Sequence, residues 1–177
     1  MMPEINFELG EAIEVLERTP GTLSSLLSGL SDGWLHANEG ENTWTPIQVL
    51  DHLMEAEKSN WIPRLELMIR HGEAATFPPF DRFAHLNKAT DSSLDRKLLE
   101  FRELRRLNII RLRELVRTDD QLALQGRHPQ FGTVKVRELL SAWVVHDLTH
   151  MVQILRVMAK RYKRDVGPWI EFLGILK

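Results

Sequence analysis

The sequence predicts an all-α protein, a four-helix bundle with a short C-terminal helix. Four long stretches place apolar residues at the repeat of about 3.6 residues that is typical of an amphipathic helix. No stretch shows the strict alternation of apolar and polar residues expected of a half-buried strand. Polar or aperiodic connections separate the four stretches. Amphipathic helices of this length are stable when they bury their apolar faces against one another, as they do in a bundle.

The first helix is expected over residues 7–30, with Pro20 as an interruption. Its inward positions are Ile13, Leu16, Leu23, Leu26, Leu27 and Leu30. Proline has no backbone N–H, so Pro20 should kink the helix or start a second one that Thr19 caps.

The second helix is expected from Thr45-Pro46 to about residue 71. A capping hydroxyl followed by proline is typical of a helix start. His52 lies at the margin of its apolar arc, and Glu57 lies within that arc. A buried carboxylate is costly unless it is paired. We prefer an ion pair between Glu57 and an arginine, and a role beside a metal ion is the alternative.

The connection at residues 72–91 is longer than most links between helices and is rich in aromatic residues. We expect it to pack over one end of the domain. It is also long enough to cross the length of the bundle, which leaves an up-down-down-up order of helices open. The third helix should begin after Ser92 or Ser93 and reach about Arg117. Its arginine- and glutamate-rich face is interpreted as solvated.

The fourth helix should begin between Thr133 and Arg137 and reach about Arg161. It carries His146 and His150, which are four residues apart and therefore lie on one face with Cβ atoms about 5–6 Å apart. After it, Val166 and the apolar tail are expected to form the short last helix and to cover the bundle.

Composition limits the classes of partner and the compartment. One domain spanning residues 1–177 accounts for the length. The net charge of −2, with no basic block, argues against nucleic acid as a partner. No apolar run reaches the ~20 residues of a membrane span, and the first residues do not resemble a signal peptide. Cysteine is absent, which fits a cytoplasmic location and leaves nitrogen and oxygen as ligands for any metal.

His146 and His150 fall within the buried stripe of the fourth helix, where polar rings need partners. A pair of core histidines bonded to other side chains explains them as well as a metal does. If His52 meets them across the bundle, three imidazoles leave one coordination position open for water or substrate, as in catalytic sites. A bound metal would then lower the pKa of that water.

Two other metal sites fit poorly. The run His146-Asp147-x-x-His150 is similar to the zinc-protease motif, but aspartate replaces the longer glutamate base and the further downstream histidine is missing. A di-iron bundle requires Glu-x-x-His on two helices. No such tetrapeptide occurs in the sequence.

Two segments carry a resemblance to a known family. Residues 44–53, Trp-Thr-Pro-Ile-Gln-Val-Leu-Asp-His-Leu, followed by Glu57, resemble the second helix of the DinB-like superfamily, which includes YfiT-like metal-dependent hydrolases. Residues 126–153, with Gly126-x-His128-Pro129 and then Trp143, His146-Asp147-Leu148-x-His150-x-x-Gln153, resemble its fourth helix and the approach to it. Residues 80–85 are similar to its middle loop.

The resemblance implies an up-down-down-up bundle in which His52, His146 and His150 bind a divalent metal, commonly Zn, Ni, Fe or Mn. It also implies either a thiol S-transferase that uses bacillithiol or mycothiol, a maleylpyruvate isomerase, or a protein without an assigned reaction. Homodimers are frequent in the family, so the resemblance leaves a homodimer open.

A ligand imidazole usually donates its second N–H to a carboxylate, carbonyl or water. The candidates for this role are Asp147, Glu57, Gln153 and Glu55. His85 and His128 could line the mouth of the site, although we favour plain surface positions for both. Trp44, Trp61 and Trp143 are interpreted as core residues, and Trp143 could also wall the pocket.

Three functions are therefore open. The first is an enzyme in which the metal activates a small thiol, or alternatively a water for ester or amide hydrolysis. The second is a non-catalytic metal-binding stress or interaction protein. The third is a helical protein whose histidines are structural. The enzyme needs a metal and a small-molecule substrate, and the metal-binding protein needs a metal. None of the three functions needs nucleic acid or a membrane.

Overall fold

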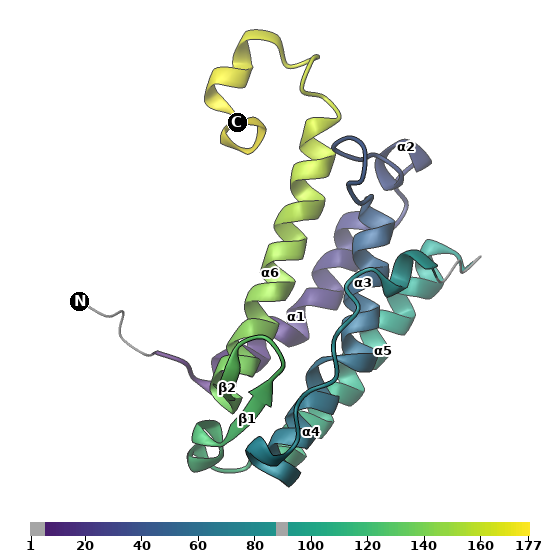
Figure 1. Cartoon of the computed structure of the whole chain (residues 1–177). Coiled ribbons are helices and arrows are strands. Elements are labelled where there is room, and N and C mark those ends of the chain that lie inside the picture. Colours follow the sequence, from purple (N-terminus) through teal and green to yellow (C-terminus); the bar gives the residue numbers. More distant parts are fainter. Residues whose placement is uncertain (1–5, 88–91) are drawn as a thin grey trace.

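Four long helical segments form the bundle (Figure 1). They are α1 (Leu9–Leu27), α3 (Pro46–Ser59) continued by α4 (Trp61–His71), α5 (Leu94–Leu115) and α6 (Val136–Lys160). A short helix, α2 (Asp32–Leu35), lies between α1 and α3. The computed structural model describes residues 6–87 and 92–177, so residues 1–5 and the end of the connection at 88–91 lie outside the described residues.

The helices follow the up-down-down-up order (Figure 1). The chain ascends in α1, descends through α3 and α4, returns along the bundle in an extended connection, descends again in α5 and ascends in α6. The predicted fold class is therefore confirmed. The connection at residues 72–87 runs beside the second helical segment rather than over one end of the bundle, and its 3₁₀ turn at Ala84–Asn87 packs on α3.

Helix α1 runs unbroken through Pro20, so the predicted interruption is wrong. Thr19 does not cap a second helix, because its hydroxyl donates to the carbonyl of Val15. Without an N–H at Pro20, the carbonyl of Leu16 loses its normal helical partner. That carbonyl instead accepts a hydrogen bond of 2.7 Å from the guanidinium of Arg105 on α5. The proline is tolerated because a neighbouring helix supplies the missing donor.

The second predicted helix is split at Asn60 into α3 and α4. Its predicted start holds: Thr45 accepts a hydrogen bond from the amide of Gln48, and the Gln48 side chain bonds back to the amide of Thr45. Pro63 explains the split, since it cannot donate to the carbonyl of Ser59 and the ladder is broken there. After the split, the buried residues of α4 belong to the same core cluster as those of α6.

A small antiparallel hairpin precedes α6, although the sequence pattern predicts no strands. Strand β1 (Gln125–His128) pairs with β2 (Gly132–Lys135). Four-residue strands are too short for alternation to be visible in the sequence. Gly126 is required here, because a Cβ would lie 2.5 Å from Met68 and 3.1 Å from Phe77. The amide of Phe77 donates to the carbonyl of Arg127, which ties the long connection to the hairpin.

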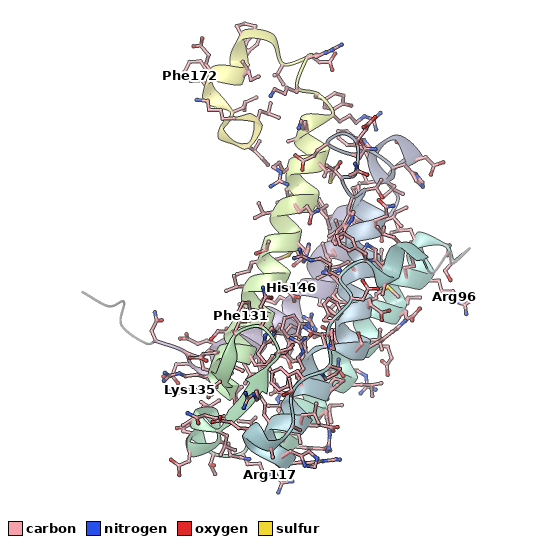
Figure 2. The ribbon with its side chains drawn as sticks, in the orientation of Figure 1. Arg96, Arg117, Phe131, Lys135, His146 and Phe172 are labelled. Carbon is pink, nitrogen blue, oxygen red and sulfur yellow. The ribbon has the colours of Figure 1, made fainter. Side chains whose placement is uncertain are left out.

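The C-terminal segment forms the 3₁₀ turns Gly167–Phe172 and Gly174–Leu176 beyond the end of α6. The expectation that it covers the bundle is wrong. Trp169 and Phe172 are 69% and 83% exposed, and Figure 2 shows Phe172 on the part that projects from the bundle. Leu176 alone among the residues of these two turns is buried.

The surface of α6 carries an exposed apolar stripe made of Val145, Leu148, Val152 and Leu155. Their spacing of three and four residues is that of a helix seam.

Within the described ranges, no helix has the length and apolar character needed to cross a membrane.

Candidate metal centre

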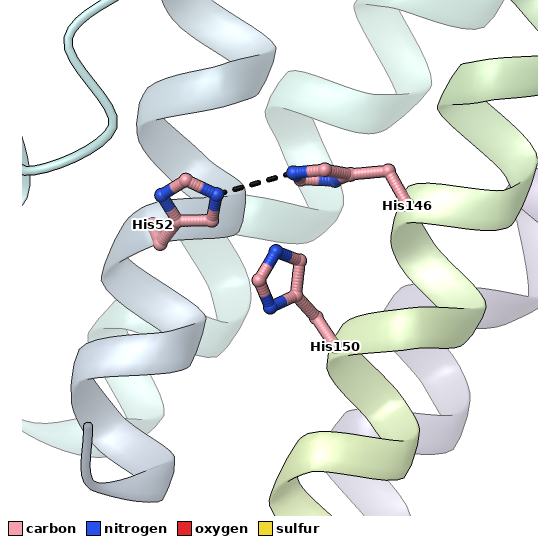
Figure 3. A group of neighbouring side chains, drawn as sticks. All are labelled: His52, His146 and His150. Carbon is pink, nitrogen blue, oxygen red and sulfur yellow. Dashed lines mark hydrogen bonds between the residues drawn. The ribbon is translucent and has the colours of Figure 1, made fainter. Parts of the chain in front are cut away.

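Three histidines from two helices meet in the middle of the bundle (Figure 3). Helix α3 supplies His52, and α6 supplies His146 and His150 from successive turns. One ring nitrogen from each lies within 4.8 Å of the others. The rings of His52 and His150 have centroids 4.6 Å apart, and those of His146 and His150 are 4.4 Å apart. The structure thus brings together the three histidines that the sequence indicates as candidate ligands.

The hydrogen bonds at Nδ1 decide which nitrogens are free to bind a ligand. His52 Nδ1 donates to the carbonyl of Arg82 at 3.2 Å, and His150 Nδ1 donates to Oε1 of Gln153 at 2.8 Å. Because an oxygen acceptor fixes the proton on Nδ1, the Nε2 atoms of both rings carry a lone pair. His146 Nε2 lies 3.1 Å from His52 Nε2. His146 Nδ1 is buried without a partner among the described residues.

Burial keeps the cluster uncharged at neutral pH. It lowers the pKa of His52 to about 3, with repulsion from His150 and His85 adding to the effect. Burial also lowers the pKa of His146 to about 3, helped by His150 and His52. The pKa of His150 is lowered in the same direction, again chiefly by burial. Neutral imidazole is the form that binds metals.

These pKa values predict that the metal-free protein loses stability in acid. Below about pH 6.5 the unfolded chain takes up protons at His52, whereas the folded chain does so only near pH 3. At about pH 5 this difference should cost about 2 kcal/mol of unfolding free energy for His52 alone. Urea unfolding at pH 7.5 and pH 5 with a chelator measures it. His52→Gln should show a smaller loss, and equal stability of the native chain at both pH values would contradict the expectation.

The cluster fits a first-row divalent metal. Two imidazole nitrogens bound to one tetrahedral zinc at about 2.0–2.1 Å lie about 3.3 Å from each other. The Nε2 atoms of His52 and His146 are already 3.1 Å apart. A ring nitrogen of His150 lies within 4.8 Å of the other two ligand atoms, so movement of this ring toward them would complete a three-nitrogen set. Since two of the three rings are held at Nδ1 by oxygen acceptors, the arrangement is typical of a supported metal site.

A buried ion-pair network includes Asp147, the residue that follows His146 on α6. Arg105 of α5 donates to Glu57 at 2.9 Å and to both oxygens of Asp147, at 2.7 and 3.1 Å. Glu57 also accepts from Trp143 Nε1 at 3.0 Å and from Asn108 Nδ2 at 2.9 Å. Burial opposes the charge of Arg105, but the two carboxylates outweigh burial and raise the pKa of its guanidinium.

This network changes the expected roles of Asp147 and Glu57. Both were candidates to orient a ligand imidazole, but their carboxylates bind Arg105. Glu57 therefore has the arginine partner that we preferred for it. Of the described candidates for this supporting role, Gln153 is the one whose side chain bonds a ligand ring. Arg105 was missed because it lies among the exposed charges of α5, and a single buried arginine does not disturb that pattern.

A cavity of about 540 Å³ opens on the histidines. Trp44 is half-buried and packs against the core, as expected, but it also lines the cavity, with its ring 4.8 Å from His52 and stacked 6.1 Å from His150. Trp61 and Trp143 are buried, as expected, and their rings stack on each other. Phe80, Arg82 and Phe83 of the long connection also line the cavity, and the ring of Phe83 lies 6.1 Å from that of Trp44.

The two loop histidines have different positions. His85 is 6% exposed and packs against Trp44 and His52, so it is not a surface residue. Its burial follows from the short 3₁₀ turn on α3, which the sequence pattern does not show. His128 lies on β1, half-buried, with its ring stacked 4.4 Å from that of Phe131. Neither is among the three residues that converge.

The contact between Gln153 and His150 gives a second prediction. Loss of such a supporting group typically lowers metal affinity 10- to 100-fold. Gln153→Leu should therefore weaken zinc binding by about that factor in a competition titration with a chromophoric chelator. Gln125→Leu, at an exposed position on β1, is the matched control and should bind zinc like the native chain. Unchanged affinity in Gln153→Leu would show that the contact does not support a metal ligand.

A solved structure and a family profile are similar to this chain, whereas comparison with curated protein sequences gives no match. Among solved structures, YfiT from Bacillus subtilis is similar, with 23% sequence identity and a TM-score of 0.74 over 90% of this chain and 93% of that one. YfiT is described as a probable metal-dependent hydrolase with an unusual four-helix bundle topology. At this identity the likeness shows the fold. The sequence profile of the DinB superfamily matches residues 15–154, and the chain belongs to this superfamily.

Proposed function

We propose that the protein is a divalent-metal-dependent enzyme of the thiol S-transferase or hydrolase type. The observation that carries the proposal is the convergence of His52, His146 and His150 on one point at the wall of an open cavity. Zn, Ni, Fe and Mn all accept nitrogen ligands of this kind. A bound divalent metal would lower the pKa of a thiol or a water and so supply a nucleophile at neutral pH.

The chain's own groups would position the metal ligands and the substrate. Gln153 and the carbonyl of Arg82 hold two imidazoles with Nε2 directed toward the common point. The rings of Trp44 and Phe80 pack against that of His52, with centroids 4.8 and 5.8 Å away, and both line the cavity. The cavity volume of about 540 Å³ is in the range of sites for small molecules.

A thiol-consumption assay tests the proposal. Protein loaded with each metal is incubated with a panel of low-molecular-weight thiols and monochlorobimane, and the product is compared with that of His150→Ala. We expect thiol consumption that depends on the metal and is lost in His150→Ala. Ester and amide panels test the hydrolase alternative in the same way. No turnover above the variant with any thiol, ester or amide would contradict the enzymatic proposal.

One observation favours a non-catalytic metal-binding protein as the second candidate. The carboxylates nearest to the histidines in the network are committed to Arg105, and Glu39 at the cavity wall is held by Arg156 at 2.7 Å. A general base is therefore not evident among the described residues that line the cavity. This alternative predicts metal binding with no turnover, so metal analysis together with the assay separates the two.

The homodimer implied by the family stays a prediction. The apolar stripe on α6 gives it a test, because an exposed seam of this kind is stabilised by pairing with a second helix. Val152→Glu should convert a dimer to monomers in sedimentation equilibrium. A dimer that persists in this variant would place the interface elsewhere.

A further inference from the structure

A second cavity adjoins the one that opens on the histidines. It measures about 440 Å³ and lies between the 79–82 segment and the hairpin tip that carries Phe131, which Figure 2 labels. Three residues line both cavities: Arg64, Phe80 and Arg82. The two hollows therefore meet at a junction that contains two arginines. A ligand longer than one cavity could occupy both.

The arginines of this junction lack a counter-ion within the described part of the chain. Arg64 is half-buried on α4, and its guanidinium makes one long hydrogen bond, 3.4 Å to the carbonyl of Pro78, and lies over the ring of Phe77. The carbonyl of Arg82 accepts from His52, but no acidic side chain among the described residues pairs with its guanidinium. By contrast, Arg156, which lines the cavity that opens on the histidines, donates three hydrogen bonds to the carboxylate of Glu39.

An unpaired, half-buried arginine is unusual, because partial removal of water costs free energy that a carboxylate normally offsets. Burial lowers the pKa of Arg64, which shows that its surroundings disfavour the charge. Among the described residues, none of those that line the second cavity is acidic. The junction is therefore a positively charged site walled by Phe80 and Phe131, and it is complementary to an organic acid.

We propose that the substrate of the three-histidine site is an elongated organic acid. Arg64 and Arg82 bind its carboxylate or phosphate group at the junction, the reacting group lies at the histidines, and the remainder extends along Phe80 toward Phe131. The proposal deepens the proposed function, since it takes the three histidines as the reacting end. The charged group is a binding determinant and takes no part in bond making.

A matched pair of thiols tests the inference. N-acetylcysteine and N-acetylcysteine amide differ only in the replacement of the carboxylate by a neutral amide. Calorimetric titration of metal-free and zinc-loaded protein should show the acid binding at least about tenfold more tightly than the amide, a typical effect of charge-assisted pairing. Competition by inorganic phosphate or by acetate identifies which acid the junction prefers, and either result supports the inference.

Variants at the junction decide whether the arginines cause this preference. Arg64→Gln and Arg82→Gln should each reduce the acid-to-amide ratio to below about threefold, while Arg70→Gln, exposed on the same helix as Arg64, should leave it unchanged. The Arg82 side chain is exposed, so Arg82→Gln remains informative if Arg64→Gln folds poorly. Equal binding of acid and amide by the native chain, or a preference that survives in Arg82→Gln, would overturn the inference.

These results separate the inference from the proposed function. The metal-free protein could prefer the acid while the chain binds no metal or consumes no thiol. That result would support the charged junction and contradict the proposed enzyme. Metal-dependent consumption of acid and amide at equal rates would support the enzyme and contradict the charged junction.

Discussion

Arg105→Ala is expected to lower the free energy of unfolding by about 3–5 kcal/mol. The substitution leaves Glu57 and Asp147, which are 2% and 0% exposed, without the cation that both of them bind. It also removes the donor from the Leu16 carbonyl that Pro20 leaves without a helical partner. Urea unfolding at neutral pH measures the effect.

A control on the same helix separates burial from charge. Arg113 pairs with Glu17 at 2.9 Å, but both side chains are about half exposed. Arg113→Ala should therefore cost no more than about 1 kcal/mol. If Arg105→Ala costs as little as Arg113→Ala, the buried network does not stabilise the fold in the way described.

A combined variant tests the cause of the loss. Arg105→Met together with Glu57→Gln and Asp147→Asn removes all three charges while keeping side chains of similar size. Because the main cost of Arg105→Ala is two unpaired buried charges, this variant should recover a substantial part of the lost stability. A triple variant that is less stable than Arg105→Ala would show that hydrogen bonding rather than charge dominates.

Arg105 joins all four helical segments of the bundle. It lies on α5 and donates to Leu16 on α1, Glu57 on α3 and Asp147 on α6. Asp147 immediately follows His146, so its bond to Arg105 fixes the rotation of α6 that directs His146 and His150 toward His52. The network thus supports the histidine cluster through the backbone of α6.

Saturating zinc is expected to stabilise the native chain and to leave a ligand variant almost unaffected. At a free zinc concentration 1,000 times the dissociation constant, mass action adds about 4 kcal/mol to the free energy of unfolding. His146→Ala removes one of three nitrogens, and the gain should fall to a small fraction of this value. His71→Ala is the control, because His71 is exposed at the end of α4 and far in sequence from the cluster.

Thermal or urea unfolding with zinc and with a chelator measures this difference. Comparison of the chelator-treated proteins corrects for the effect of each substitution on the fold itself. Equal zinc stabilisation of the native chain and His146→Ala would mean that zinc binds elsewhere.

Much of the fold could be predicted because helical periodicity is local. The capping box at Thr45 and the cap at Ser93 are set by neighbours three residues away, and both occur where expected. The unbroken α1 could not be predicted in this way, because Pro20 is tolerated only through Arg105, far along the chain. The hairpin also depends on contacts with residues far along the chain, at Met68 and Phe77.

The site was predictable to a similar degree. The spacing of His146 and His150 places them on one face of a helix whatever the tertiary structure, and His52 joins them because α3 packs on α6. The roles of Trp44 and His85 were missed because connections bring them to the histidines. The arginines of the junction lie on α4 and on the long connection, and no local pattern indicates that they share two cavities.

The most direct test of the central claim is the metal content of the protein purified without a histidine tag, loaded with zinc and desalted. Elemental analysis should give one zinc ion per chain for the native protein and for His71→Ala, and close to none for His52→Ala and His150→Ala. These two variants remove one ligand from each of the helices that form the cluster. A native chain without bound metal, or variants that retain a full equivalent, would contradict the account.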